Sequence, residues 1–283
     1  MAAVTITDPA VIRGEVSASR AAGRVVGFVP TMGALHAGHL ALVEQATREC
    51  DDVAVSIFVN PTQFGPGEDF ERYPRTLDRD LDSLSRLRVR WVFTPTEAAM
   101  YPHGAATRVV VAGPACGYEG TIRPGHFSGV ATVVCRLFLS VPADRAYFGA
   151  KDWQQTRVIE RMVRDLGLPI AVVVCPTVRE PDGLAMSSRN AYLAPEDRSR
   201  AVALSESLRE AAAAWDAGAD VNGIEAAMRT RLESRGIVVD YVAIADAESL
   251  GQVVTGQPAV ALVAGRLGST RLIDNRLLSP RVG

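Results

Sequence analysis

Apolar positions along the first 175 residues alternate between short continuous runs and longer segments with helical spacing. The runs predict β-strands at residues 24–29, 52–59, 90–93, 107–111, 145–148 and 169–175, the last of a type buried on both faces. The helical spacing predicts helices at residues 9–22, 38–49, 76–87 and 129–139, and one more that ends near residue 166. Strands that alternate with helices favour a parallel sheet, so we expect an α/β fold with a Rossmann-like, doubly wound sheet.

This alternation stops near Pro176. A polar hinge follows at residues 177–194, and then a helix that opens at Pro195, a second helix after Asp220, and strand-like segments at residues 238–244, 259–263 and 270–273. Helices followed by strands indicate a separate, smaller α+β domain. The predicted domains are residues 1–177 and 178–283, and the segment Met186-Ser187-Ser188-Arg189 lies at the start of the second.

The stretch from Val29 to His39 joins the end of an apolar strand, a glycine turn and the start of a helix. The first backbone N–H groups of a helix are unpaired and partly positive, and Gly33 and Gly38 let this backbone approach a ligand closely. A phosphate chain is the natural ligand. His36 and His39 are three residues apart, on nearly one face of the first turn, where a protonated or donating imidazole adds a further contact.

Two other interpretations of the histidines stay open at this point. They could be zinc ligands, although no acidic residue lies between them and no cysteine is near enough to complete a tetrahedral set. They could also serve only to satisfy backbone groups at the helix start.

Composition narrows the classes of partner. The chain has 283 residues, 48% of them hydrophobic and 22% charged, which is ordinary for a globular protein with two medium domains. A net charge of −2 and a pI near 6.1 predict no general attraction to nucleic acid or to anionic membranes. No signal peptide or membrane-spanning apolar stretch is expected, which favours a cytoplasmic location. The four scattered cysteines are expected to be reduced and buried.

Polar residues also follow the other predicted strands. Asn60 to Phe64 lie where the second strand ends, and ligands of open α/β sheets bind beyond such ends. The glycine- and proline-containing stretch at residues 65–75 is predicted to be a long loop of the kind that forms lids. Lys151, Asp152 and Gln155 are spaced to converge on one side of a helix start. His103, beside a Pro-Gly turn, is expected on the surface.

A series of motifs then resembles one family. The pattern His36-x-Gly-His39 after a strand resembles the nucleotidylyltransferase signature. The fuller series, in order along residues 24 to 193, closely resembles the pantoate–β-alanine ligase family: Pro30-Thr31-Met32-Gly33 with His36-x-Gly-His39, Asn60-Pro61-Thr62-Gln63-Phe64, Tyr73-Pro74-Arg75-Thr76, Arg123-Pro124-Gly125-His126-Phe127, Phe148-Gly149-x-Lys151-Asp152-x-Gln154-Gln155 and Met186-Ser187-Ser188-Arg189-Asn190.

The resemblance implies a reaction in two steps. ATP and (R)-pantoate give a pantoyl adenylate and pyrophosphate, and β-alanine then attacks the acyl carbon to give pantothenate and AMP. Attack of a carboxylate on the α-phosphorus needs alignment of the reactants and neutralisation of charge on the phosphates. The resemblance further implies a homodimer, and Mg²⁺ is expected to be carried with ATP. From the net charge, no nucleic-acid or membrane partner is expected.

The same resemblance assigns roles by position, with His39 as the proton donor. The catalytic set is His36, His39, Lys151, Ser187, Ser188 and Arg189. The ATP-binding set is Met32, Gly33, Ala34, Leu35, His36, Ala37, Gly38, His39, Gly149, Ala150, Lys151, Asp152, Val178, Met186, Ser187, Ser188 and Arg189. The substrate-binding set is Pro30, Thr31, Met32, Asn60, Gln63, Tyr73, Phe148, Gln155, Arg123 and His126, with Glu119 as a further candidate. For Asn60, Tyr73, Glu119, Arg123 and His126, the alternative of a polar group that only satisfies a loop or a sheet edge stays open.

The side-chain chemistry fits these roles. The amides of Gln63 and Gln155 can bond the hydroxyls and carboxylate of pantoate, and Met32 and Phe148 can cover its dimethyl carbon. The Met-Ser-Ser-Arg segment resembles the Lys-Met-Ser-Lys-Ser loop of related synthetases, but Ala185 replaces the leading lysine, which leaves its phosphate contact open.

Two rival functions differ in class. A nucleotidylyltransferase that stops after nucleotide transfer has no obvious use for Gln63 and Gln155 at the strand ends. A non-catalytic nucleotide-binding module has no need of both histidines and Lys151, and ATP turnover separates it from an enzyme.

Overall fold

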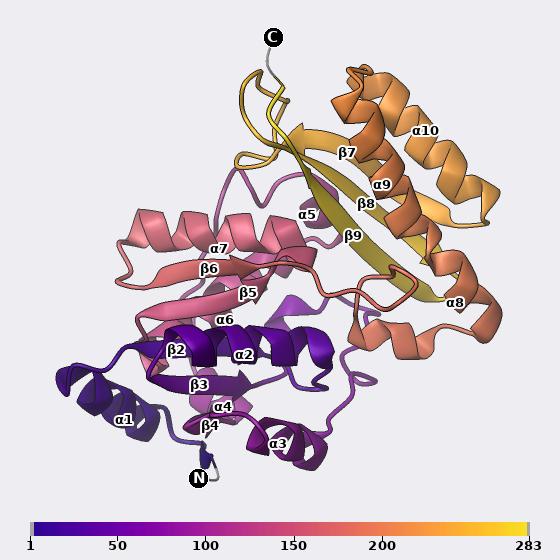
Figure 1. Ribbon diagram of the computed structural model, residues 1–283. Helices are drawn as coiled ribbons and strands as arrows, with labels where there is room; N and C mark the ends of the chain where they lie inside the picture. The colour runs from indigo at the N-terminus through magenta and orange to yellow at the C-terminus, as the bar shows by residue number, and fades with distance from the viewer. Residues whose placement is uncertain (1–2, 282–283) are drawn as a thin grey trace. The chain divides into compact units, whose positions relative to one another are not determined.

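The computed structural model describes residues 3–281 and divides into two compact units (Figure 1). The first unit comprises Met1–Gly149 and Gln155–Cys175, and the second comprises Ala150–Gln154 and Pro176–Gly283. The short segment Ala150–Gln154 therefore belongs to the second unit, although it lies between two stretches of the first. The boundary predicted after residue 177 lies two residues beyond the break at Cys175.

The first unit is built on a six-stranded parallel sheet in the order β1-β4-β3-β2-β5-β6. Its strands are β1 (Val4–Ile6), β2 (Val26–Thr31), β3 (Asp52–Ile57), β4 (Trp91–Phe93), β5 (Arg145–Gly149) and β6 (Ala171–Cys175). Its helices are α1 (Pro9–Ala21), α2 (Ala37–Glu49), α3 (Leu77–Ser85), α4 (Glu97–Met100), α5 (Tyr118–Ile122), α6 (His126–Ser140) and α7 (Trp153–Leu166), with a 3₁₀ turn η1 (Pro61–Gln63). The first two residues of α7 belong to the second unit. The predicted Rossmann-like sheet is confirmed.

Helices cover both faces of this sheet because successive side chains along each strand point to opposite sides. Phe28 and Phe148 belong to the core shared with α1, α6 and α7. Their neighbours Val29 and Tyr147 belong to the core shared with α2 and α3. This alternation predicts the layers that the structure shows.

Several predicted elements differ from the observed ones. Residues 107–111 do not form a strand: Val109 and Val111 pack on the core and Val110 is 77% exposed, but the amide of Val109 donates to the hydroxyl of Thr132 rather than to a neighbouring strand. The hydroxyl of Thr132 thus takes the place of the carbonyl group that a neighbouring strand would offer to the amide of Val109. The strand β6, expected to be buried on both faces, is an edge strand and is mostly half-buried.

Short elements were missed. The strand β1 has only three residues, and α4 and α5 have four and five, too few to show a period. The prediction of buried cysteines is wrong for Cys116, which is exposed, whereas Cys175 is buried. None of the four cysteines, all within residues 3–281, forms a disulfide.

The second unit is an antiparallel sheet of three strands in the order β7-β8-β9, with a helical layer. The strands are β7 (Val238–Asp246), β8 (Ala259–Leu267) and β9 (Thr270–Leu278), and the helices are α8 (Pro195–Ala201), α9 (Ala203–Asp216) and α10 (Val221–Ser234). Two 3₁₀ turns complete it, η2 (Ala150–Asp152) and η3 (Ser188–Tyr192). Leu208 and Trp215 of α9 and Met228 of α10 pack against β8 and β9, as expected for a smaller α+β domain.

Within residues 3–281, none of the helices combines the length and apolar character needed to cross a bilayer. Among the same residues, no three or more His, Cys, Asp or Glu side chains are grouped as a metal site.

Candidate functional site

The strands β2 and β5 are neighbours in the centre of the first unit's sheet, and the chain leaves them in opposite directions along it (Figure 1). After β2 the chain passes through α2 to β3 on one side, and after β5 it passes through α7 to β6 on the other. Ligands of open α/β sheets bind at such a switch point, beyond the carboxyl ends of the strands. These ends are Thr31 and Gly149.

The turn after β2 is held by a buried carboxylate. Gly33 has φ +82° and Ala34 has φ +51°, a left-handed conformation that is costly for alanine. The amides of Ala34 and Leu35 both donate to Asp80 of α3, at 2.9 and 2.8 Å. A Cβ on Gly33 would lie only 3.0 Å from an oxygen of Asp80. Asp80 is 1% exposed, so water does not compete with these two hydrogen bonds, and they hold the turn in place.

His36 and His39 cap the helix that follows. His36 is the N-cap residue of α2, and its Nδ1 accepts the amide of Gly38 at 3.1 Å. The Nδ1 of His39 in turn accepts the amide of His36 at 3.4 Å, and the two ring centroids are 4.1 Å apart. A ring nitrogen that accepts a backbone N–H presents its lone pair rather than a proton. In both histidines Nδ1 therefore serves the backbone of the helix start, and Nε2 is the ring nitrogen that these two hydrogen bonds do not use.

Asn60 organises the end of β3. It is 1% exposed, and its Oδ1 accepts the hydroxyl of Tyr101 at 2.8 Å while its Nδ2 donates to the carbonyl of Gly129 at 3.2 Å and to Oε1 of Gln63 at 3.1 Å. Gln63 uses its Nε2 to contact Sδ of Met32 at 3.0 Å. Asn60 therefore sets the orientation of the Gln63 amide, and the structure brings together the predicted residues Met32, Asn60 and Gln63.

Arg123 and His126 hold the backbone of the same turn. Arg123 forms a bidentate ion pair with Glu68, at 2.8 and 2.5 Å, and its Nη1 donates to Nε2 of His126 at 3.1 Å. Because arginine only donates, Nδ1 of His126 carries the proton and donates to the carbonyl of Gln63 at 2.9 Å. Burial, and then the charge of Arg123, lowers the pKa of His126 from 6.5 to about 4. Both side chains thus bind protein groups that position Gln63 and the loop at residues 65–75.

The remaining substrate candidates of the first unit lie in different surroundings. Thr31 is buried, and its hydroxyl donates to the carbonyl of Ser56 at 2.7 Å. Phe148 is 5% exposed and packs edge-on against Phe138 in the core, and Tyr73 is 6% exposed against Phe64. Pro30, in β2, and Gln155, in the first turn of α7, are half-buried.

In the second unit, Lys151 and Asp152 lie in η2, not in the α-helix where their spacing was expected to place them. The Nζ of Lys151 is 3.9 Å from a carboxylate oxygen of Asp152, and the lysine side chain is 19% exposed. Lys151 follows the end of β5 by two residues.

The other residues predicted in this unit belong to a hairpin and the turn after it. Arg179 pairs with Ala185 in an antiparallel bridge, and the amide of Met186 donates to the carbonyl of Val178 at 3.0 Å. Ser187 then caps η3, its hydroxyl accepting the amide of Arg189 at 3.2 Å. The backbone that carries Ser187, Ser188 and Arg189 is thus defined by the hairpin.

Four residues that shape the site were not predicted from the sequence, and two of them left a signal. Asp80 lies one helical turn before Leu84, on the apolar side of α3, where a carboxylate needs buried partners. Gly129 lies within an apolar helix, where glycine often marks a close backbone approach. Glu68 and Tyr101 left none, because their partners are distant in the sequence.

Comparison with known proteins gives a consistent result. A family model described as Pantoate-beta-alanine ligase matches residues 4–277. The pantothenate synthetase of Roseiflexus castenholzii is 53% identical over 271 residues, 94% of this chain and 97% of the relative, and that of Thermus thermophilus is 54% identical over 263 residues, 90% and 94% of the two chains. A crystal structure of pantothenate synthetase from Thermus thermophilus matches with a TM-score of 0.90 and 49% identity, covering 98% of this chain and 100% of the other. The Francisella tularensis pantoate-beta-alanine ligase, solved with beta-gamma ATP and beta-alanine, has a TM-score of 0.80 and 35% identity over 98% of both chains.

Proposed function

Since the chain belongs to the pantoate–β-alanine ligase family, we propose that its capped histidine pair acts on ATP in an AMP-forming synthesis of pantothenate. The enzyme is an ATP-dependent ligase that joins (R)-pantoate to β-alanine. The reaction is proposed to pass through a pantoyl adenylate.

In the first step a carboxylate oxygen of pantoate attacks the α-phosphorus of ATP. The bond from the α-phosphorus to the bridging oxygen breaks, and pyrophosphate leaves with that electron pair. In the second step the amine of β-alanine attacks the acyl carbon, loses a proton, and expels AMP. No covalent enzyme intermediate is needed, so the protein contributes alignment of the reactants and stabilisation of the charge on the phosphates.

The single observation that carries this proposal is the way the two imidazoles cap the start of α2. Their Nδ1 atoms accept backbone amides there, at 3.1 and 3.4 Å, and Nε2–H of each ring is proposed as the donor to the phosphates. Donors fixed before the reaction cost no reorganisation as charge develops on the leaving pyrophosphate. The partly positive helix start adds to the same field. His39 is proposed as the donor to the leaving group, with His36 beside it.

Pantoate is proposed to bind next to Gln63. The Gln63 amide is oriented by Asn60, and Met32 supplies an apolar contact for the dimethyl carbon. Gln155 is proposed as the second amide. Phe148 and Tyr73 are proposed to shape the apolar wall rather than to hydrogen-bond the substrate, in keeping with their burial.

Lys151, Ser187, Ser188 and Arg189 are proposed to supply further donors and positive charge to the ATP phosphates. Lysine and arginine are the usual partners of phosphate oxygens. Asp152, 3.9 Å from Lys151, is proposed to orient the lysine.

Three features of the holoenzyme are also proposed. Mg²⁺ is carried mainly by the phosphate oxygens of ATP, as suits an ion that keeps several waters and takes few protein ligands.

The enzyme is a homodimer in the cytoplasm. Light scattering at micromolar concentration tests the dimer, and a monomer at all concentrations would contradict it.

The route is tested by the products formed without β-alanine. With ATP and pantoate alone, rapid-quench measurement should give a pyrophosphate burst near one equivalent per site, because the adenylate stays bound and shielded from water. Addition of β-alanine should restore turnover and release AMP. Formation of ADP and inorganic phosphate, or steady pyrophosphate release without β-alanine, would contradict the proposal.

A further inference from the structure

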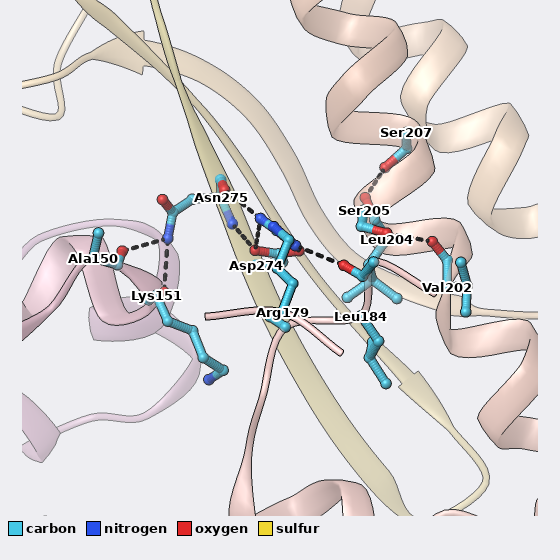
Figure 2. A network of polar contacts seen from close by, with 12 residues as sticks. Ala150, Lys151, Arg179, Leu184, Val202, Leu204, Ser205, Ser207, Asp274 and Asn275 are labelled. Atoms are coloured by element: carbon cyan, nitrogen blue, oxygen red, sulfur yellow. Dashed lines mark hydrogen bonds and ion pairs between the residues drawn. The ribbon is translucent and has the colours of Figure 1, made fainter. Parts of the chain in front are cut away.

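Two consecutive polar residues of the edge strand β9 are buried and bind two different loops of the second unit (Figure 2). Asp274 and Asn275 are 3% and 6% exposed. Successive residues on a strand point to opposite faces, so one strand can hold one loop on each side. Both loops carry residues to which a role in the reaction is assigned above.

Asn275 binds the loop that carries Lys151. Its Nδ2 donates to the carbonyl of Ala150 at 2.9 Å and to the carbonyl of Lys151 at 2.7 Å, so both amide hydrogens are used on consecutive backbone groups (Figure 2). The indole of Trp153 adds a second attachment two residues later, donating to the carbonyl of Ala247 at 2.9 Å. The backbone under Lys151 is therefore fixed by side chains of the second unit.

Asp274 binds the hairpin that leads to Ser187. Its carboxylate forms a bidentate pair with Arg179, at 2.7 and 3.0 Å (Figure 2). Arg179 also donates to the carbonyl of Gly183 at 3.0 Å. The side chain of Asp274 is 1% exposed and that of Arg179 is 29% exposed. A bidentate pair fixes direction as well as distance, so it defines the hairpin's orientation on β9.

Position matters more for Lys151 than for an average lysine. Its flexible stem has no fixed geometry of its own, and its ion pair with Asp152 is long at 3.9 Å. The place of its ammonium group therefore depends on where the backbone holds its Cα. A shift of about 1 Å in a catalytic group can cost on the order of a hundredfold in rate.

We propose that Asn275 is a positioning residue for adenylate formation, acting through the Lys151 backbone, and that the Asp274–Arg179 pair holds the Ser187–Arg189 segment from the same strand. This inference rests on the proposed role of Lys151. One strand thereby sets the spacing between two groups of phosphate donors within the second unit.

The test is a double-mutant cycle on pantoate-dependent pyrophosphate formation. Asn275→Ala should lower kcat at least about tenfold, with the KM for ATP within about threefold, because the change acts on placement in the transition state. The double variant Lys151→Ala/Asn275→Ala should be no slower than Lys151→Ala alone, since residues that act through one group are not additive. Arg276→Ala, an exposed neighbour on β9, is the matched control and should keep wild-type kcat.

Conservative variants separate positioning from folding. Asn275→Gln keeps both donors and should recover part of the lost kcat, and Asn275→Ser replaces Asn275→Ala in the cycle if the alanine variant does not fold. Additive losses in the cycle, or a kcat of Asn275→Ala equal to that of Arg276→Ala, would overturn the proposal. Failure of the proposed function is distinguishable, because wild-type enzyme would then give ADP, or Lys151→Ala would keep full activity.

Discussion

Each imidazole of the His36–His39 pair uses Nδ1 to bind the backbone, and Nε2 is the nitrogen proposed to bind the ligand. The Nδ1 of His36 accepts the amide of Gly38, and the Nδ1 of His39 accepts the amide of His36. The interpretation of the histidines as backbone-satisfying groups is therefore correct for Nδ1. It does not exclude a role in catalysis, because the role proposed above uses Nε2.

This division can be tested at position 36. Asparagine is among the best N-cap residues, so His36→Asn should keep the stability of α2 while removing the Nε2–H donor. We expect kcat to fall by roughly a hundredfold, the loss typical for one transition-state donor, with ATP affinity by calorimetry changed less than about threefold. His36→Ala should lose the same activity and about 1 kcal/mol of stability as well. Near-normal turnover in His36→Asn would remove His36 from the catalytic set.

His126 predicts a pH dependence of stability. Its pKa is lowered from 6.5 to about 4 by burial and by Arg123, so the unfolded chain binds its proton more readily than the folded one. The contribution of His126 to the free energy of unfolding is complete above its pKa in the unfolded chain, about 6.5, and is lost as pH falls from there towards its pKa in the folded protein, about 4. Between pH 7 and pH 5 the loss should be about 2 kcal/mol.

Urea unfolding of wild type and His126→Gln at the two pH values measures this difference. The glutamine side chain is expected to donate to the carbonyl of Gln63 as well, but it does not titrate. Between pH 7 and pH 5, the free energy of unfolding of the variant should therefore fall by about 2 kcal/mol less than that of the wild type. Equal declines in the two proteins would show that His126 does not titrate in this range.

Among the elements, the contact of α6 with η1 shows how packing fixes the turn that carries Gln63, the residue proposed to bind pantoate. A Cβ on Gly129 would overlap the carbonyl oxygen of Thr62 and lie 2.7 Å from Cα of Gln63. The carbonyl of Gly129 also accepts Nδ2 of Asn60. Glycine at this position is therefore needed for the close approach of two backbones.

Gly129→Ala should push η1 away from α6. We expect a raised KM for pantoate, roughly tenfold or more, and a loss of about 1–3 kcal/mol in stability, as for overpacked positions. Gly14→Ala is the control, because Gly14 lies in a helix with no atom within 4 Å of a Cβ, and alanine there should be neutral or slightly stabilising. Unchanged pantoate kinetics in Gly129→Ala would show that η1 does not position the substrate.

At the same scale, elements marked by an apolar run or by helical spacing were predictable, and those without either signal were not. Apolar runs marked the strands β2 to β6, and helical spacing marked α1, α2, α3, α6 and α7, whereas α5 lies between glycines with no period to detect. The segment 107–111 shows the opposite error. Its alternation is real, but a strand also needs a neighbour, and pairing cannot be deduced from one segment alone.

For the whole molecule, the motifs identified the residues of the candidate site but not the contacts that hold them. The histidine motif and Asn60–Gln63 were predictable because they end adjacent strands of a βαβ unit. Glu68 and Asn275 were not, because each binds a partner at least 55 positions away. The first unit carries the histidines and the second carries Lys151 and the Ser187–Arg189 segment.

The fate of one oxygen atom tests the adenylate route most directly. With both carboxylate oxygens of pantoate labelled with oxygen-18, attack on the α-phosphorus makes one of them the bridge of the adenylate, and β-alanine then expels it with AMP. Mass spectrometry should therefore find one labelled oxygen in each AMP, with the other retained in the amide carbonyl of pantothenate. Label in inorganic phosphate, together with ADP, would show attack on the γ-phosphorus and contradict the assigned roles of the histidine pair.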